Sequence, residues 1–396
     1  MKHILLPTVI LFLLTRWTTA GAQSAPAQPQ TVAPSRPQKG IVYPPGHPQT
    51  PEPPYPYHSD SVEYDNADKT VHFGATLTYP ETGGPFAAAI LITGSGTQDR
   101  DETIFSHHPF AVIADYLTRH GYAVLRVDDR GAGLSTGDVK KATTAVFAED
   151  VETSFAWLKE RKEIDPRKIG LIGHSEGGMI APMVAAENAD IAFIISLAGP
   201  FSGDSTTMYQ VEAALRQYHT PTPLAQYTLA TERIVLENVK IADDTAALLK
   251  GIDRDYRAYY ATIPDSIRSK DLALQPTPDN FVHSIAPKVL PAFVPWWKFY
   301  IAYNATPYYS KVKCPVLLVG GAKDIQVDNA TDIPRLAAIL KTHGNKKVET
   351  HLMPDLNHLF QHCTACTVAE YSKLDETFSP EVLSIMVTWL DKEIRK

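Results

Sequence analysis

The sequence predicts an α/β fold, with a mostly parallel central sheet and helices on both of its faces. Three observations support this prediction: short apolar runs alternate with helix-like segments, the pentapeptide Gly-His-Ser-Glu-Gly at 173–177 stands between one such run and the next helix, and a helix-rich region interrupts the alternation. Alternating strands and helices build parallel sheets because each crossover helix packs onto a sheet face. We therefore expect one core formed by residues 61–198 and 310–396, with an inserted helical cap at 199–309.

The first 60 residues are expected to lie outside the folded core. Residues 1–22 combine a lysine, an apolar stretch and small residues ending in Ala-Gly-Ala, which is the pattern of a secretory signal peptide. An uncleaved membrane anchor is the alternative, although the apolar stretch is short for a membrane span. Residues 23–60 are expected to be a disordered linker, because 11 prolines fall within residues 23–57. An exported protein, periplasmic or extracellular, without stable membrane insertion after signal cleavage, is therefore expected.

The elements of the core are predicted from apolar runs of strand length and from helical periodicity. A polar turn at residues 65–68 joins two strand-like runs at 62–64 and 70–73, so a hairpin is expected to open the core. Further strands are expected at 86–92, 122–127, 168–172, 191–197, 315–320 and 348–353, with helices at 109–120, 145–161, 178–187, 333–341 and 381–395.

The region 199–309 contains many alanines, glutamines, tyrosines and leucines and no clear strand-like run, which favours helices. We interpret it as a cap over the core. Its aromatic stretch at 296–300 fits two roles, packing of the cap on the core or lining of an apolar substrate pocket. Packing is the preferred interpretation.

The Gly-x-Ser-x-Gly pentapeptide predicts that Ser175 is a nucleophile. In this motif the serine stands on a strained turn between a strand and a helix, where neighbouring backbone leaves no room for a Cβ at the flanking Gly173 and Gly177. The apolar run 168–172 and the helix-like segment 178–187 supply that context. A buried structural serine is the alternative.

A serine hydroxyl is a weak nucleophile, so it needs a histidine base that is held in turn by a carboxylate. On a sheet of this kind the acid follows the serine in the chain and the histidine comes last. Asp324 and His358 satisfy that order, and each comes just after a predicted strand. The competing acids stand near the next helix start, where an acid usually caps, and the competing histidines lie within or beyond the last strand; these candidates are Asp328, Asp332, His351 and His362.

Acyl transfer through a serine also needs two backbone N–H groups aimed at the developing oxyanion. The residue after the nucleophile, Glu176, supplies one, and the loop after the strand at 86–92 supplies the other. By position this second donor is Ser95, with Gly96 as the alternative. The charged run at 98–102 follows this loop, and we interpret it as an ion-paired surface loop rather than as part of the pocket entrance.

Composition and cysteine usage exclude several classes of partner. The formal net charge is −7 and no cluster of lysine and arginine stands out, so neither nucleic acid nor an anionic membrane surface is an expected partner. Three cysteines are too few for a disulfide-built scaffold. Cys363 and Cys366 form one C-x-x-C pair, for which a loop-closing disulfide is preferred over a redox pair or half of a zinc site. No metal or organic cofactor is expected.

Four groups of motifs carry a resemblance to a known family. They are Ile-Thr-Gly-Ser-Gly at 92–96 with Asp-Arg-Asp-Glu at 99–102, Asp-Asp-Arg-Gly-Ala-Gly-Leu-Ser at 128–135, Gly-His-Ser-Glu-Gly-Gly at 173–178 and Leu-Asn-His-Leu-Phe at 356–360. From residue 61 onward the chain resembles α/β-hydrolases of the bacterial group that includes secreted serine esterases, dienelactone-hydrolase-like and serine-aminopeptidase-like proteins. The resemblance implies a Ser175–His358–Asp324 triad, in agreement with the order of these residues. The cysteine pair departs from the pattern of the group.

The expected activity is hydrolysis of a carboxylic ester, a small molecule, through an acyl-enzyme. A serine peptidase acting on short peptides is the alternative, and it needs a cap carboxylate to bind the free amine, for which Asp253, Asp255 and Asp265 are available. A non-catalytic binding protein on the same scaffold is a second alternative, which the intact order of serine, acid and histidine disfavours.

Overall fold

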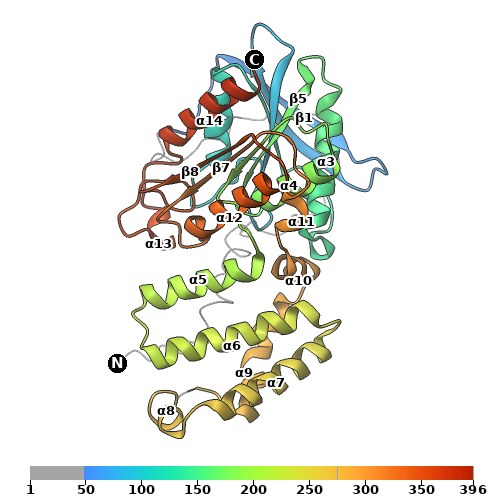
Figure 1. Ribbon diagram of the computed structural model, residues 1–396. Helices are drawn as coiled ribbons and strands as arrows, with labels where there is room; N and C mark the ends of the chain where they lie inside the picture. The colour runs from blue at the N-terminus through green and yellow to red at the C-terminus, as the bar shows by residue number, and fades with distance from the viewer. Residues whose placement is uncertain (1–48, 274, 396) are drawn as a thin grey trace.

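An eight-stranded sheet forms the centre of the fold in the computed structural model of the chain, which describes residues 49–273 and 275–395 (Figure 1). The predicted signal peptide and most of the predicted linker lie outside the described residues. The strands are β1 (Tyr57–Asp65), β2 (His72–Pro80), β3 (Phe86–Ile92), β4 (Ala123–Val127), β5 (Ile164–His174), β6 (Ile194–Leu197), β7 (Val316–Gly321) and β8 (Val348–Met353).

The strands follow the order β1-β2-β4-β3-β5-β6-β7-β8 across the sheet. β2 pairs with β1 and with β4 in the antiparallel sense, whereas β4, β3, β5, β6, β7 and β8 run parallel to one another. Parallel neighbours need crossover connections, which helices supply here. The carboxyl ends of these strands therefore meet at one edge of the sheet, where loops can carry functional side chains. The predicted α/β-hydrolase fold with a mostly parallel sheet is confirmed.

Helices cover both faces of the sheet. Successive strand residues point to opposite faces, and each face belongs to its own apolar cluster. On β3, Ile90 belongs to one cluster and Leu91 to the other. The first face packs against α3 (Thr144–Lys159), α4 (Gly177–Glu187) and α12 (Asn329–Thr342), and the second against α2 (Pro109–Arg119) and α14 (Pro380–Glu393). Two short elements complete this part of the chain, the 3-10 helix η2 (Val139–Lys141) and α13 (Val368–Tyr371).

Helices fill the segment between β6 and β7, and no strand occurs among its described residues. In Figure 1, α5 to α9 lie together below the sheet, and α10 lies beside α5, between the sheet and α6. We call this segment the cap. Its helices are α5 (Gly203–Gln217), α6 (Thr222–Ile241), α7 (Thr245–Thr262), α8 (Asp265–Lys270), α9 (Pro278–Ala292), α10 (Pro295–Ala302) and α11 (Thr306–Tyr309). Within the described ranges, no helix has the length and apolar character needed to cross a membrane.

The folded part begins before the predicted boundary at residue 61. β1 starts at Tyr57, which pairs with Pro80 of β2. The Tyr57 hydroxyl donates a hydrogen bond to Asp115 of α2 at 2.8 Å, and Gln49 Nε2 donates to the Phe378 carbonyl at 2.7 Å. These contacts to distant parts of the chain order residues whose proline-rich composition predicts a linker. The linker boundary predicted at residue 60 is therefore too late.

We expect Gly170→Ala to lower the free energy of unfolding by about 2–3 kcal/mol, because a Cβ at this position of β5 would overlap the ring of the fully buried Phe193. Gly344→Ala is the matched control. Gly344 has a φ of 90° but nothing within 4 Å of an added Cβ, so only backbone strain of about 1 kcal/mol is expected. Urea denaturation measures both values. An equal cost at the two sites would contradict the packing argument.

Candidate active site

Ser175 stands on a strained turn between β5 and α4. Its φ is 53°, in the left-handed region, and its backbone N–H donates to the Leu197 carbonyl at 2.8 Å. A Cβ at Gly173 would overlap the Gly177 carbonyl, and one at Gly177 would overlap the Ile92 carbonyl. The backbone packing that the motif predicts is thus present, and it holds the serine in a conformation that a free chain avoids.

Asp324 follows β7 and His358 follows β8, and the two side chains are hydrogen bonded. His358 Nδ1 donates to Asp324 Oδ2 over 2.8 Å, and the side chains are 1% and 0% exposed. Asp324 also accepts hydrogen bonds from the side chain of Asn329 and from the N–H groups of Gln326 and Val327. Because the proton of the ring stays on Nδ1, Nε2 is left to accept a proton from a nucleophile.

The structure places the Ser175 turn beside His358 through the preceding residue, His174. His174 Nε2 donates to the His358 carbonyl at 3.0 Å, and the two imidazole rings are 4.9 Å apart between centroids. Within the described residues, the Ser175 hydroxyl forms no hydrogen bond with His358. Catalytic hydrogen bonds are often long in the ligand-free state and shorten when substrate binds. The three predicted residues therefore share one site, with direct contact between two of them.

A buried ion pair between Glu102 and His174 joins this site to the loop after β3. Glu102 Oε1 accepts from His174 Nδ1 at 2.9 Å and from the Gly94 N–H at 2.6 Å. Both ring nitrogens of His174 thus face oxygen atoms, an arrangement that the doubly protonated, charged imidazole satisfies with two donors. Burial lowers the pKa of His174, but the Glu102 carboxylate and the His358 carbonyl outweigh it, and the pKa ends above its ordinary value.

The interpretation of residues 98–102 as a surface loop is therefore wrong. Glu102 is only 4% exposed. Arg100 pairs with Asp128 at 2.6 Å, and Arg126 pairs with Asp101, with all four side chains largely covered. A run of charged residues is typical of a solvent-exposed loop. Here, however, the charged side chains pair with residues of β4, of the segment after β4 and of the Gly-x-Ser-x-Gly motif. No local pattern in the sequence indicates these partners.

Both predicted oxyanion donors lie close to Ser175, since Glu176 is the next residue and Ser95 follows Gly94 in a neighbouring loop. A Cβ at Gly94 would be 3.2 Å from the Cβ of Ser175, so the loop that carries Ser95 approaches the serine closely. Neither the Ser95 N–H nor the Glu176 N–H donates a hydrogen bond to any other described residue. Unused backbone donors next to a nucleophile are the groups that an oxyanion hole requires.

The Glu176 side chain connects the nucleophile turn to the cap. It is 2% exposed, and its Oε1 accepts from Thr144 Oγ1 at 2.7 Å and from Trp296 Nε1 of α10 at 2.8 Å. Burial raises the pKa of this carboxyl, while the hydrogen bonds from Thr144 and Trp296 oppose the rise. Trp297 and Tyr300 are buried in the core cluster, as the packing interpretation of residues 296–300 predicts, whereas Trp296 reaches the site.

The competing candidates have other partners. Asp328 caps α12 and Asp332 accepts a hydrogen bond from the Phe201 N–H. His351 pairs with Glu349 and His362 pairs with Glu376, at 3.0 and 2.9 Å. None of these contacts involves Ser175, Asp324 or His358.

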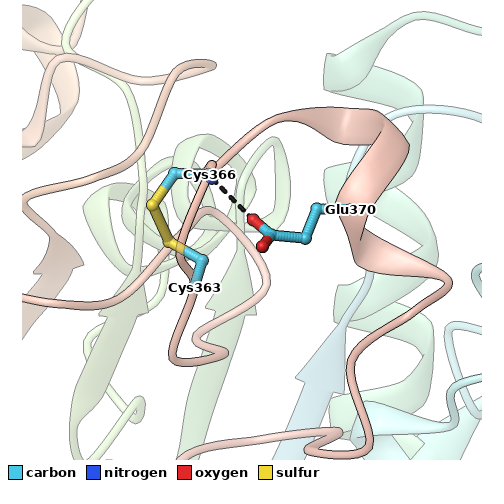
Figure 2. A group of neighbouring side chains, drawn as sticks. All are labelled: Cys363, Cys366 and Glu370. Carbon is cyan, nitrogen blue, oxygen red and sulfur yellow. Dashed lines mark hydrogen bonds between the residues drawn. A yellow bond between two sulfur atoms is a disulfide. The ribbon is translucent and has the colours of Figure 1, made fainter.

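A disulfide joins Cys363 and Cys366 in the loop beyond His358, as the sequence predicts (Figure 2). With Glu370 these sulfurs form the one cluster in the described chain whose ligand atoms lie close enough together for a metal ion. Both sulfurs are used in the disulfide, so neither offers the thiolate that a metal would need. The Glu370 carboxylate instead accepts hydrogen bonds from the N–H groups of Thr364, Ala365 and Cys366. The arrangement fits a structural role in this loop.

We expect the stabilising effect of the Glu102–His174 pair to depend on pH. A histidine whose pKa is raised on folding contributes fully below its unfolded pKa of about 6.5, and that contribution is lost as the pH rises through the folded value. Glu102→Gln should therefore lower the free energy of unfolding by about 1–3 kcal/mol more at pH 5.5 than at pH 8.5. Denaturant unfolding at the two pH values measures the difference.

Glu63→Gln is the control, because Glu63 contacts the exposed His72 and exposed pairs contribute little to stability. Equal losses for Glu102→Gln at both pH values would mean that His174 is not charged in the folded protein.

Comparison with known proteins supports the same group of enzymes. The model of the X-Pro dipeptidyl-peptidase (S15) family matches residues 50–346. Esterase EstD of Thermotoga maritima is 25% identical over 307 residues, which cover 77% of this chain and 62% of EstD. An acyl transferase of Photobacterium leiognathi is 39% identical over 98 residues, 24% of this chain and 30% of that protein. The matched regions thus span less than two thirds of either relative.

Solved structures share the fold at low sequence identity. The α/β-hydrolase GrgF from Penicillium sp. sh18 has a TM-score of 0.50 at 16% identity. The match covers 86% of this chain and 100% of GrgF. A hypothetical protein from Pseudomonas aeruginosa has a TM-score of 0.51 at 15% identity, with 90% and 99% of the two chains covered. The sheet topology and the family match at residues 50–346 together assign the chain to the X-Pro dipeptidyl-peptidase (S15) family of the α/β-hydrolase superfamily.

Proposed function

We propose that the protein is a serine hydrolase that cleaves a carboxylic ester through an acyl-enzyme on Ser175. The observation that carries this proposal is the buried hydrogen bond between His358 and Asp324, which His174 links to the Ser175 turn. A neutral imidazole with its Nδ1 proton bound by a carboxylate is the base that a serine hydroxyl requires. Esterase EstD, a relative over 77% of this chain, supports an ester as the substrate.

The proposed reaction has two steps. Ser175 Oγ attacks the ester carbonyl and His358 Nε2 takes the hydroxyl proton, while the N–H groups of Ser95 and Glu176 stabilise the oxyanion. The imidazolium then gives its proton to the departing alcohol, which leaves an acyl group on Ser175. Water, activated by His358 in the same way, releases the acid and restores the serine. Asp324 orients the imidazole throughout.

A peptidase acting on short peptides is the second candidate, favoured by the family match to X-Pro dipeptidyl-peptidases. The three cap acids considered for amine binding have other partners. Asp253, Asp255 and Asp265 each pair with an arginine of the cap on the exposed surface, namely Arg257, Arg254 and Arg268. They do not support this candidate.

We further propose that the enzyme is exported and acts in the periplasm or outside the cell. The proposal is supported by the signal-like residues 1–22, which lie outside the described part of the chain. Measurement of the N-terminus of the protein recovered from culture and from the cell envelope tests it.

We expect Ser175→Ala to lower kcat on p-nitrophenyl esters by about 10³- to 10⁶-fold and to abolish labelling by a fluorophosphonate probe. Asp324→Asn should lower kcat by about 10⁴-fold, because the amide favours the wrong imidazole tautomer. Asp328→Asn is the matched control and should keep near wild-type activity, since Asp328 caps α12. Circular dichroism confirms that each variant is folded.

A parallel assay with aminoacyl anilides separates the two candidates. Cleavage of anilides without cleavage of esters would replace the esterase proposal by the peptidase one. Wild-type activity in Ser175→Ala would refute both.

A further inference from the structure

The cap contacts the loop that carries Asp324, which we call the acid loop (residues 324–327). Two consecutive residues of the cap helix α5 make this contact. The Tyr209 hydroxyl donates a hydrogen bond to the Asp324 carbonyl at 2.8 Å, and Gln210 Nε2 donates to the Gln326 carbonyl at 3.2 Å. The backbone of the acid loop is thus bound by side chains that lie 115 and 116 positions earlier in the chain.

The backbone of the acid loop is coupled to the carboxylate of Asp324. The Gln326 N–H donates to Asp324 Oδ1 at 2.7 Å, and the opposite oxygen, Oδ2, accepts from His358 Nδ1. Just before the loop, the Lys323 N–H donates to the Leu356 carbonyl at 3.0 Å, which joins it to the segment that carries His358. A shift of this backbone would therefore move the carboxylate that holds the imidazole.

The same part of the cap also contacts the nucleophile turn. Trp296 of α10 donates to the carboxylate of Glu176, the residue after Ser175, at 2.8 Å. The two cap helices meet through their backbones, because a Cβ at Gly203, the first residue of α5, would overlap the Tyr300 carbonyl of α10. Packed on each other in this way, α5 binds the acid loop and α10 binds the nucleophile turn.

We propose that Tyr209 is a positioning residue for Asp324, through which the cap fixes the acid loop relative to the Ser175 turn. Its hydroxyl binds the main chain of the acid and not the carboxylate. Burial and the negative charge of Asp324 raise the pKa of Tyr209, so the hydroxyl keeps the proton that it donates. This inference rests on the proposed hydrolase function and adds to it a residue outside the Ser175–His358–Asp324 triad.

The first test removes the hydroxyl alone. Tyr209→Phe keeps the ring and its contact with the Arg216 guanidinium, which lies 5.7 Å from the ring centre. We expect kcat on p-nitrophenyl esters to fall about three- to tenfold, as the loss of one hydrogen bond gives. KM should stay within about twofold of the wild-type value, because the acid acts in the chemical step and not in substrate binding.

Tyr218→Phe is the matched control. Tyr218 stands at the C-terminal end of the same helix and is 58% exposed, so loss of its hydroxyl should leave kcat and KM unchanged. A kcat of Tyr209→Phe equal to that of the wild type, or a loss that appears in KM alone, would overturn the proposal.

The second test asks whether Tyr209 acts through Asp324. Tyr209→Phe, Asp324→Asn and the double variant form a mutant cycle, with the labelling rate of a fluorophosphonate probe as the readout where turnover is slow. In the Asp324→Asn background, Tyr209→Phe should cause less than about a twofold further loss, because the carboxylate that it positions is absent. Losses that multiply in the double variant would mean a general structural role and would overturn the proposal.

A third readout does not need catalysis. The exchange of the His358 Nδ1 proton with solvent reports how often the hydrogen bond to Asp324 opens. In the Ser175→Ala background, NMR should show this exchange about three- to tenfold faster in Tyr209→Phe and unchanged in Tyr218→Phe. Equal exchange in the two variants would count against positioning.

These readouts separate failure of the positioning role from failure of the proposed function. An enzyme that cleaves esters with the same kcat in the wild type and in Tyr209→Phe keeps the function and lacks the positioning residue. A chain that cleaves no ester, yet exchanges the His358 proton faster in Tyr209→Phe, keeps the positioning contact and loses the esterase function.

Discussion

The arrangement of the site depends on the buried ion pair between Glu102 and His174. Three loops follow three different strands, β3, β5 and β8, and this pair contacts all of them through the Gly94 N–H, the His174 ring and the His358 carbonyl. A hydrogen bond between charged groups is shorter and stronger than a neutral one, and burial removes the competition from water. This pair therefore links the loop after β3, the Ser175 turn and the loop after β8 to one another.

The loop after β8, which carries His358, needs the contact with His174 because this loop reaches across the sheet. β6 and β7 separate β5 from β8, so the chain after β8 must return over two strands to bring His358 to Ser175. Local contacts give the loop its shape: Asn357 Oδ1 accepts from the N–H groups at 359 and 361, and the disulfide and Glu370 order the residues that follow. The position of His358 is thus determined by its own loop and by His174 together.

Local features of the sequence predicted most of the fold and the three candidate catalytic residues, two of which are hydrogen bonded in the structure. Apolar runs predicted the strands. The Gly-x-Ser-x-Gly motif predicted a nucleophilic serine, because close backbone contacts leave no room for a Cβ at its two glycines. The features that the sequence did not predict depend on distant pairs. Glu102 is 72 positions from His174, and Trp296 is 120 positions from Glu176, so neither contact leaves a local pattern. The start of β1 at Tyr57, before the predicted boundary, has the same cause, because it depends on pairing with Pro80 of β2.

Glu176 combines two groups with opposite electrostatic effects. Its backbone N–H would stabilise the oxyanion, whereas a charged carboxylate on the same residue, with Asp129 nearby, would repel it. Protonation of the two acids avoids that repulsion, and burial favours protonation because it raises the pKa of both carboxyls.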